Sequence, residues 1–503
     1  MKKIILCFMI GLLSVAPIVG WAAPPEFSGG VNNEYAYEEI VFITGKPVKF
    51  VGTLALSERE KENTKTITYR FNKLTPEDKT IEAELTKSVT FVTEYTNRNE
   101  KGQTIAQTRV EKYSESLKIG QDKYELKDFQ FSKSDVIDNR PAAAFYSGNL
   151  KGRKYYVINK DQGEVVVDIS GGSVGYENFW GNTETQIIDY VIQTTRLLPS
   201  DGNNGQQANE KTSWQGTVRV QTSDSQTKTL KYAENEANFS SFYGGHIRIT
   251  NREMVSRYDY NLPQIAENKA DGSKRNKGSM ALSKQMVPKL ERLIVPKFRD
   301  IGGHWAQESI EKLYSLDVFD EQSSFFAPNI PFTRGEFIKG VIRACDIRPN
   351  LDASLKPSRS RKQPPEESPF QDVKVEDKHY QYIKSGLEKQ IISGVSPDRF
   401  DPEGPLTRAQ AITILIRALG FENKGPSPGY YTSFADDRDI PNWARDSIYV
   451  AKEIHLIQGD DFNRVNPNKV VSRAEASAML VRFLEFLEKD LQRDYRENII
   501  QFQ

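Results

Sequence analysis

The sequence predicts a multidomain chain: a β-rich N-terminal region, all-β or α+β, followed by an all-α module of repeated helix-loop-helix units. Three observations support this prediction. Residues 46–56, 65–71 and 88–95 alternate apolar and polar side chains, as half-buried strands do. From about residue 296 onward the apolar residues instead recur at helical spacing. In that second part a short motif also occurs three times.

Composition narrows the classes of protein that this chain can belong to. A length of 503 residues suggests about three domains. The formal net charge is zero, whereas a surface that binds nucleic acid usually shows an excess of basic residues. With 38% hydrophobic and 27% charged residues, the chain is typical of folded domains with a well-solvated surface. We therefore expect no nucleic-acid partner.

The N-terminus has the pattern of a secretory signal. Lys2 and Lys3 precede an apolar stretch, and the small residues Gly20 and Ala22 suit a cleavage site after residue 22. An uncleaved membrane anchor is the alternative. Cleavage would leave Cys345 as the only cysteine, buried in an apolar helix and unable to form an intramolecular disulfide. We expect residues 1–22 to be removed, giving an exported protein of the bacterial envelope that no longer contacts the membrane.

The motif that recurs is Ser or Thr, Arg, a small residue, and Glu or Gln. It begins at Thr333, Thr407 and Ser472. Each copy follows a Phe-x-Asp element, whose aspartate lies 34, 36 or 37 residues before the arginine of the motif. The first and fourth positions form a capping box, which predicts the start of a helix. Each unit therefore reads as a helix, a loop and a second helix that begins at the motif.

Capping does not account for the arginine of the motif. A cation at the first helical position opposes the helix dipole, at a cost of roughly 0.3–1 kcal/mol. Yet Arg334, Arg408 and Arg473 all stand there. One interpretation is a receptor for a carboxylate, since a helix N-terminus and a guanidinium both bind anions. The other is an internal ion pair with the aspartate of a Phe-x-Asp element.

Together these elements resemble the S-layer homology repeat of bacterial surface proteins. Residues 326–337 (FAPNIPFTRGEF) and 394–411 (GVSPDRFDPEGPLTRAQA) follow the family pattern over their whole lengths. The resemblance covers residues 296–488 and divides them into repeats at 296–347, 368–422 and 432–488. Between the first two repeats, residues 348–367 are rich in Pro, Ser and charge and are expected to form an exposed loop. Residues 489–503 are expected to form a tail.

The resemblance implies a pseudo-three-fold helical module that binds a secondary cell-wall polysaccharide attached to peptidoglycan. In this family the sugar often carries pyruvate, whose carboxylate would bind the arginine of the motif. The ligand-binding residues that the resemblance implies are Asp300, Trp305, Arg334, Asp372, Tyr380, Gly394, Arg408, Asp436, Trp443, Gly459 and Arg473. Repeat one lacks the usual glycine in its loop, Tyr380 stands where tryptophan is usual, and repeat three is the most complete. We therefore expect unequal pockets.

Several of these residues have a second interpretation. Trp305 and Trp443 could pack in the core. The aspartates of the Phe-x-Asp elements could cap the first helix of each repeat. His304, His379 and His455 lack the spacing of metal ligands, so we expect them at the surface and expect neither a metal nor a cofactor.

Residues 23–263 form the β-rich region. One helix is predicted within it, at residues 183–193, with Thr183 and Gln186 as a possible capping box. Residues 50–56 and 64–69 resemble residues 214–220 and 227–232, so the region could contain two related units, about 35–197 and 213–263. Residues 264–295 read as a linker that becomes helical near Leu282.

The β-rich region shows no catalytic motif. His246 is its only histidine, and no glycine-rich loop follows a strand. We therefore expect a displayed region without enzymatic activity. The alternatives are a glycan hydrolase with two carboxylates, for which Glu177, Glu184 and Asp189 beside residues 176–180 form the one cluster to inspect, and a self-assembling envelope component.

Overall fold

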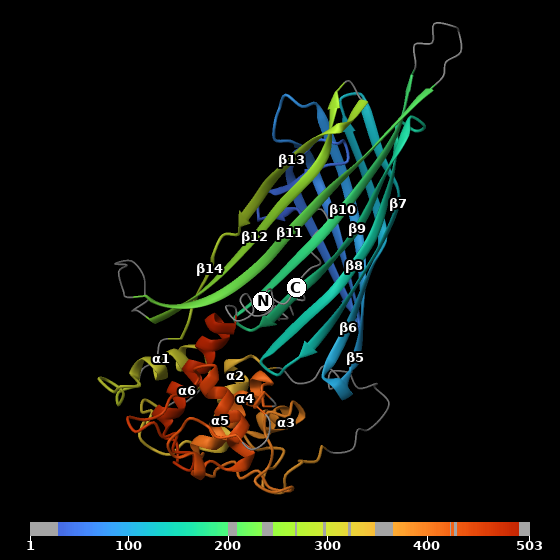
Figure 1. Cartoon of the computed structure of the whole chain (residues 1–503). Helices are drawn as coiled ribbons and strands as arrows, with labels where there is room; N and C mark the ends of the chain where they lie inside the picture. The colour runs from blue at the N-terminus through green and yellow to red at the C-terminus, as the bar shows by residue number, and fades with distance from the viewer. Residues whose placement is uncertain are drawn as a thin grey trace, which may run out of the picture.

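The computed structural model describes residues 29–199, 209–233, 245–266, 269–294, 298–319, 323–347, 366–422, 424–426 and 430–491. They form a long, strongly curved antiparallel sheet and a cluster of helices that lies at one end of its strands (Figure 1). The predicted order, a β-rich region followed by helices, is confirmed. The signal sequence, most of the loop at 348–367 and most of the tail lie outside the described residues.

The sheet is a meander in which each strand pairs with the next one along the chain. Its strands are β1 (Val31–Asn32), β2 (Tyr37–Val41), β3 (Val48–Lys61), β4 (Thr64–Pro76), β5 (Ala83–Arg98), β6 (Gln103–Ile119), β7 (Asp122–Asn139), β8 (Ala143–Ile158), β9 (Gly163–Asn178), β10 (Gly181–Pro199), β11 (Asn209–Ala233), β12 (Gly245–Ala266), β13 (Lys269–Gln285) and β14 (Lys289–Arg292). β14 leaves this order and pairs with β12.

The curvature brings the first strands against the last ones. The Nδ2 of Asn33 donates to the carbonyl of Gln285 over 3.3 Å, and the hydroxyl of Tyr258 donates to the carbonyl of Gly29 over 2.6 Å. Side chains alternate between the two faces of each strand, and the apolar ones point inward. The sheet thus encloses a continuous apolar core, and its outer face is polar.

The helix predicted at residues 183–193 is wrong, because these residues lie inside β10. They pair with β9 on one side and β11 on the other, so their backbone groups are satisfied without a helix. The β-branched Ile188 and Ile192 point into the core and are 0% and 2% exposed. Thr183 caps nothing; its hydroxyl is 2.9 Å from that of Ser225 on the neighbouring strand.

The linker predicted at residues 264–295 is also wrong, because the sheet continues through it to Arg292. Leu282, where a helix was expected to begin, is a buried residue of β13. The two related units are not formed either. Residues 50–56 and 64–69 belong to separate strands, β3 and β4, whereas residues 214–220 and 227–232 lie on the single strand β11. The region is therefore one sheet.

The helical part contains two helices for each repeat. They are α1 (Gln307–Ser315), α2 (Arg334–Ala344), α3 (Tyr380–Glu388), α4 (Arg408–Leu419), α5 (Asn442–Glu453) and α6 (Arg473–Glu485), and a π-helical turn, η4 (Phe486–Asp490), follows α6. The predicted capping boxes are present at the starts of α4 and α6. At α2 the hydroxyl of Thr333 accepts the backbone N–H of Glu336. Cys345 is buried, as predicted.

The end of the sheet packs into the apolar core of the helical part, which is separate from the core that the sheet encloses. Trp180 and Tyr176 belong to the same cluster of buried residues as side chains of all three repeats. Two hydrogen bonds reinforce this contact: the N–H of Ala142 donates to the carbonyl of Ala418 over 2.8 Å, and Asn178 Nδ2 donates to that of Leu487 over 3.0 Å. The described helices include none with the length and apolar character needed to cross a membrane.

Candidate functional site

The three motif helices start from a common centre. The residues immediately before the three motifs hydrogen-bond through their backbones in a closed ring: the N–H of Phe332 donates to the carbonyl of Val471, that of Leu406 to Phe332, and that of Val471 to Leu406, each over 2.9 Å. Because each segment bonds to both others, the N-terminus of each motif helix meets a neighbouring repeat. The arginines therefore lie at junctions between repeats.

Arg334, the first residue of α2, lies against the second repeat. Its guanidinium is 4.7 Å from the centre of the Phe400 ring, and its Nε donates to the carbonyl of Phe400 over 3.0 Å. Its Nη2 reaches the carbonyl of Ser393 at 3.4 Å. Among the described residues it has no ion-pair partner. Burial lowers its pKa, although the nearby carboxylates of Asp401 and Asp372 oppose this effect.

Arg408, the first residue of α4, lies in the same way against the third repeat. Its Nη2 contacts the carbonyl of Gln458 at 3.4 Å, and within the described part of the chain it has no ion-pair partner. Gln458 and Gly459 also line an open pocket of about 480 Å³, together with residues at the end of α5 and Asn463. Burial lowers the pKa of Arg408, although the carboxylates of Glu475, Asp460 and Asp436 act in the opposite direction, Glu475 most strongly.

Arg473, the first residue of α6, differs from the other two. Its guanidinium packs 4.3 Å from the centre of the Phe326 ring in the first repeat, and its Nη1 is 3.3 Å from Oε1 of Glu336. The third junction therefore already contains a carboxylate that belongs to the protein. An external anion would have to compete with Glu336 for this arginine.

These contacts show which aspartate each arginine faces. The sequence left this open, and the electrostatic neighbours are Arg334 with Asp372, Arg408 with Asp436, and Arg473 with Asp300. In each case the arginine of one repeat faces the aspartate of the next, and the third repeat faces the first.

The three aspartates hold backbone amides. Asp300 accepts the N–H groups of residues 326 and 327, Asp372 those of 400 and 401, and Asp436 those of 465 and 466, at 2.6–2.9 Å. Burial alone would raise the pKa of Asp300 and Asp372, but these N–H donors outweigh it and lower the pKa. Among the described residues, Arg334 and Arg408 form no ion pair with these aspartates, and the proposed cap of the first helix is not formed in any repeat.

The aromatic candidates separate into two exposed residues and one buried residue. Trp305 and Trp443 are 66% and 55% exposed, so their interpretation as core residues is wrong. Tyr380 is 1% exposed and its hydroxyl donates to Glu366 over 3.0 Å, so its ring cannot stack on a ligand. In the second repeat, the residue that aligns with Trp305 and Trp443 is Lys378, which is exposed.

Two further expectations concern histidine and glycine. His379 was expected at the surface but is 1% exposed, and burial lowers its pKa. Gly394 and Gly459 close tight loops: a Cβ at residue 394 would lie 2.2 Å from the carbonyl oxygen of Ser396, and one at residue 459 would lie 2.8 Å from Cα of Asn463. Loop closure therefore requires both glycines, and Gly459 in addition lines the pocket.

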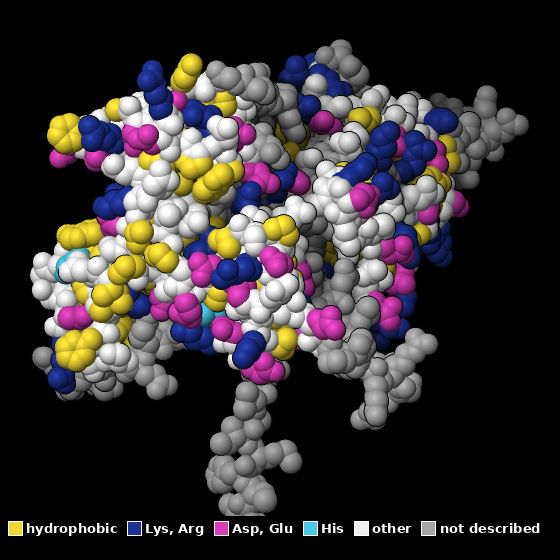
Figure 2. Space-filling model, turned by 90° about the horizontal axis from the view of Figure 1, so that it is seen from below, with side chains coloured by type: hydrophobic (Ala, Val, Ile, Leu, Met, Phe, Trp, Pro, Cys, Tyr) yellow, Lys and Arg dark blue, Asp and Glu magenta, His cyan; other side chains and the backbone are white. Residues whose placement is uncertain are grey.

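The sequence did not single out the groups that surround the arginines. Phe400 under Arg334 and Phe326 under Arg473 each stand eight residues before a motif arginine, but they serve the arginine of another repeat. This regular spacing was a usable signal. The pairing of Glu336 with Arg473 had no such signal, because 137 residues separate the two. Seen from the helical end, acidic and basic side chains are interspersed over the surface (Figure 2). The site is therefore defined by the contacts of the individual arginines and not by a large patch of one charge.

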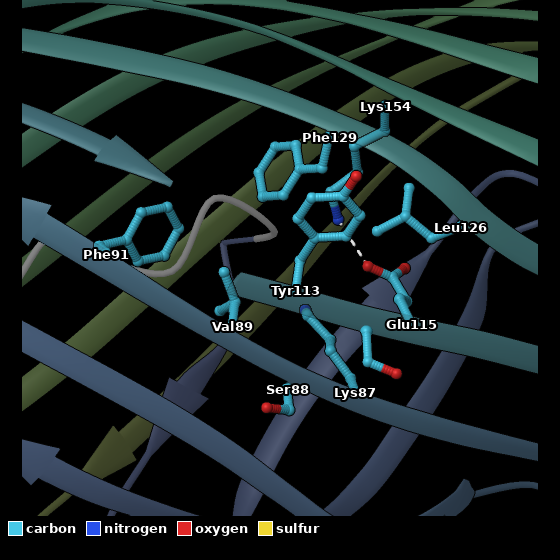
Figure 3. A pocket seen from close by; sticks show the side chains of 10 residues that line it. Lys87, Ser88, Val89, Phe91, Tyr113, Glu115, Leu126, Phe129 and Lys154 are labelled. Atoms are coloured by element: carbon cyan, nitrogen blue, oxygen red, sulfur yellow. Dashed lines mark hydrogen bonds and ion pairs between the residues drawn. The ribbon is translucent and has the colours of Figure 1, made fainter. Parts of the chain in front are cut away.

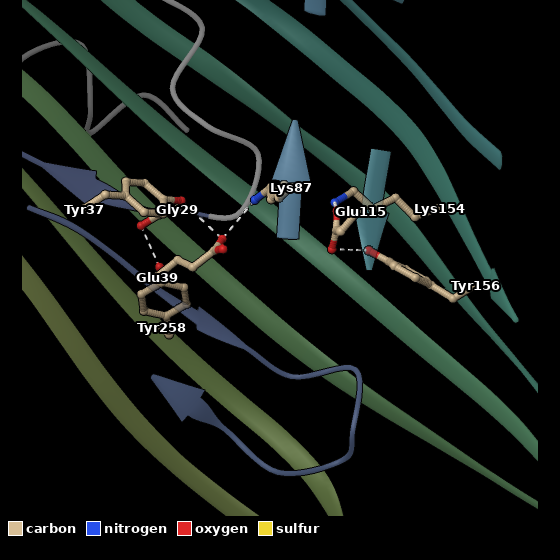
Figure 4. Close-up of polar contacts among 8 residues, drawn as sticks. All are labelled: Gly29, Tyr37, Glu39, Lys87, Glu115, Lys154, Tyr156 and Tyr258. Carbon is tan, nitrogen blue, oxygen red and sulfur yellow. Dashed lines mark hydrogen bonds and ion pairs between the residues drawn. The ribbon is translucent and has the colours of Figure 1, made fainter. Parts of the chain in front are cut away.

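The interior of the sheet contains a second set of charged residues. Lys87 contacts Glu39 at 2.9 Å and Lys154 contacts Glu115 at 2.7 Å, while the hydroxyl of Tyr156 donates to Glu115 over 2.8 Å (Figure 4). Lys87, Glu115 and Lys154 also line a narrow pocket between the strands, together with aromatic and aliphatic side chains (Figure 3). Each of these cations is thus neutralised by a carboxylate.

Of the three carboxylates considered for an alternative glycan hydrolase, Glu184 and Asp189 lie on opposite faces of the sheet. Glu184 points into the sheet, where it contacts Lys133 at 2.9 Å, whereas Asp189 is on the outer face and pairs with Arg219 at 2.8 Å. Their side chains therefore cannot flank one substrate. No group of three or more metal-ligating side chains occurs among the residues that the structure describes.

Comparison with known proteins identifies the helical part. The family model described as the S-layer homology domain matches residues 297–338, 369–412 and 433–477. Similar curated proteins include an endoglucanase from Bacillus sp. (strain KSM-635), 33% identical over 135 residues, which are 26% of this chain and 14% of the relative. The surface-layer 125 kDa protein of Lysinibacillus sphaericus is 25% identical over 226 residues, 42% of this chain and 18% of that protein.

A cellulosome-anchoring protein from Acetivibrio thermocellus is also similar, at 30% identity over 105 residues, 21% of this chain and 23% of the relative. The chain thus spans less than a quarter of the length of each of these proteins. These matches establish the three S-layer homology repeats.

Proposed function

We propose that this exported cell-surface protein, whose C-terminal part consists of three S-layer homology domains, is held on the cell wall without a covalent bond. S-layer homology domains bind cell-wall polymers. The polymer that fits this chain best is a secondary wall polysaccharide with a carboxylate-bearing sugar, such as a pyruvylated one. It would bind at the junctions between repeats, and the sheet would be displayed outward.

The observation that supports this proposal is the state of Arg334 and Arg408. Arg334 is buried and Arg408 is half-buried, each at a helix N-terminus, and among the described residues neither forms an ion pair with a carboxylate. Burying a guanidinium without a direct ion-pair partner is unfavourable. A carboxylate on the ligand would supply that counter-charge and could accept two N–H groups from one guanidinium. The pocket beside Gln458 gives the sugar room at the second junction.

The three junctions would not bind equally. We infer that the second, with Arg408 and the adjacent pocket, is the principal site and that the first, with Arg334, is the next. The third would be the weakest, because Glu336 already occupies Arg473. The closed ring of backbone hydrogen bonds supports a pseudo-three-fold arrangement, so the inequality would arise from side chains rather than from the positions of the helices.

Sedimentation with purified wall sacculi tests this proposal. The full chain should sediment with intact sacculi and remain in solution when their secondary polysaccharide has been stripped. The double variant Arg334→Ala, Arg408→Ala should remain in solution with intact sacculi as well. Arg153→Ala, which removes an equally charged but exposed residue of the sheet, is the matched control and should bind like the unchanged chain. Sedimentation that is insensitive to both the stripping and the double variant would refute the proposal.

For the sheet we propose display rather than catalysis. Its inward carboxylates, such as Glu39, Glu115 and Glu184, are tied to lysines, which leaves them poorly suited to act as a general acid or a nucleophile. Release of reducing sugar from wall glycan by the purified chain, and loss of that release on changing one of these residues, would contradict this assignment.

A further inference from the structure

The outer face of the sheet contains a groove that the proposed anchoring does not use. It has a volume of about 540 Å³ and lies across β10, β11 and β12, where the connection from β13 to β14 forms a wall. Hydroxyl side chains are the commonest kind in its lining, contributed by Thr183, Thr185, Ser223, Ser225 and Thr227.

The register of the strands places these hydroxyls in rows on one face. Thr183 pairs with Ser225, which pairs with Glu253, and Glu253 pairs with Gln285. The next row runs from Thr185 through Ser223 to Val255. Successive outward residues of adjacent strands thus form a flat array, and their small size keeps the groove open.

The same three strands have a different character farther along the outer face. There Asp189 pairs with Arg219 at 2.8 Å, and Arg257 pairs with Asp259. The face therefore changes from ion pairs to uncharged hydroxyl and amide groups within a few residues along each strand. Solubility alone does not require this change, because the charged pairs farther along the face would serve it equally well.

The described residues that line the groove offer no free cation. Arg252 lies at its edge, but its guanidinium is held by Asp224, with Nε 2.9 Å from Oδ1. Within the same set of lining residues the carboxylate is that of Glu253, which accepts an N–H of Gln285 at 3.4 Å. An anionic ligand would therefore gain little here. Hydroxyl and amide groups both donate and accept hydrogen bonds, as the hydroxyls of a sugar do, and Val255 and Met286 add apolar surface for the C–H face of a ring.

We propose that this groove binds a short segment of a neutral glycan. Its volume falls in the range of small-ligand sites, roughly 300–1,000 Å³. The site is chemically distinct from the junctions of the helical repeats, where the ligand must carry a carboxylate. It does not depend on the proposed anchoring, because none of the residues that line it belongs to a repeat.

Titration calorimetry on the full chain tests this inference, with chitotetraose, cellotetraose and maltotetraose as neutral probes and tetragalacturonate as an anionic one. At least one neutral probe should bind saturably. Ser225→Lys, and separately Ser223→Lys, should weaken that binding by about tenfold or more, because lysine fills the groove and removes hydrogen-bonding partners. Thr217→Lys is the matched control: it is an exposed outward residue of β11 beyond the groove, and affinity should not change.

Hydrogen exchange with the bound probe gives a second measurement that does not depend on a variant. Amides of residues 181–187 and 221–227 should exchange more slowly with the neutral probe, while those of residues 408–419 should not change. The inference is overturned if no neutral probe binds, if the serine variants bind as the unchanged chain does, or if tetragalacturonate binds more tightly than all three neutral probes. These results test the groove alone. Whether the arginine variants lose wall anchoring does not affect them.

Discussion

The interior of the sheet and the junctions of the helical repeats both remove charged side chains from water, but they compensate the charge differently. In the sheet each of Lys87, Lys133 and Lys154 contacts a carboxylate on a strand that is not adjacent to its own in the sheet. In the repeats Arg334 and Arg408 contact carbonyl oxygens and, for Arg334, an aromatic ring. A buried pair is complete in itself, whereas a guanidinium without a direct ion-pair partner retains the capacity to bind an external anion.

Arg473 combines features of both cases. It stands in the same sequence motif as the other two arginines, but like the buried lysines of the sheet it contacts a carboxylate of the protein. The motif places it at the start of α6, yet Glu336 of the first repeat neutralises it. Identical motifs therefore need not give identical sites. The following changes test this distinction between paired and unpaired buried charge.

The largest effect is expected where a buried pair of the sheet is broken. Lys133 lies 2.9 Å from Glu184 and 3.2 Å from Asp135; burial would lower the pKa of Lys133, but these carboxylates prevail and raise it. Lys133→Met should reduce the free energy of unfolding by about 3–5 kcal/mol, because it leaves buried carboxylates without a cation. Urea unfolding monitored by circular dichroism measures this loss.

The exposed pair of Asp189 and Arg219 is the control for that experiment. Asp189→Asn should change the free energy of unfolding by less than about 1 kcal/mol, since water already screens such a pair. If Lys133→Met and Asp189→Asn reduced the free energy of unfolding equally, burial would not determine how much these ion pairs contribute to stability.

Removing the unpaired arginine should affect binding and leave stability nearly unchanged. Arg408→Ala should weaken binding to intact sacculi by about 30-fold, corresponding to about 2 kcal/mol for a lost charge-assisted contact. Arg473→Ala should show the reverse pattern, with little loss of binding and a lower melting temperature, because Glu336 loses its partner. Binding isotherms and thermal melts of the two variants measure these effects. If both variants lost binding and stability to the same extent, the distinction between paired and unpaired arginines would be wrong.

The aspartates give a smaller effect that depends on pH. The folded-state pKa of Asp372 lies below its ordinary value of 3.8, since two backbone N–H groups stabilise the carboxylate against the effect of burial. Its stabilisation is thus fully present above about pH 4 and is lost as the pH falls through the lowered pKa. Asp372→Asn should cost about 1 kcal/mol at pH 7.

That difference between Asp372→Asn and the unchanged chain should shrink as the pH falls and vanish once the pH lies well below the lowered pKa of Asp372, where both side chains are neutral. Thermal melts monitored at the helical band across this range provide the measurement. A difference that stayed constant with pH would show that the ionised carboxylate is not what holds residues 400 and 401.

The smallest change in stability is expected for an exposed aromatic residue. Trp443 is 55% exposed near the start of α5, about one helix length from the pocket at the other end of α5. Trp443→Ala should shift the free energy of unfolding by no more than about 0.5 kcal/mol. A loss of several kcal/mol in an unfolding titration would instead restore its interpretation as a core residue.

The helical repeats could be predicted because their signals are local. Capping boxes at Thr407 and Ser472, apolar residues at helical spacing and turn-forming loops act within a few residues, and the structure forms all of them. β10 could not be predicted in the same way. Residues 183–193 satisfy a helical pattern, and only pairing with β9 and β11 makes them a strand.

The candidate site shows the same limit. The sequence by itself determined that an arginine begins each of three helices and that a Phe-x-Asp element precedes it, because capping and helical spacing are properties of neighbouring residues. Only the tertiary structure decided that each arginine serves the junction with the next repeat, that Asp372 holds backbone amides, and that Glu336 neutralises Arg473. The reason is physical: the charge state of a buried group depends on what folding brings within a few ångströms of it, and sequence distance does not report that.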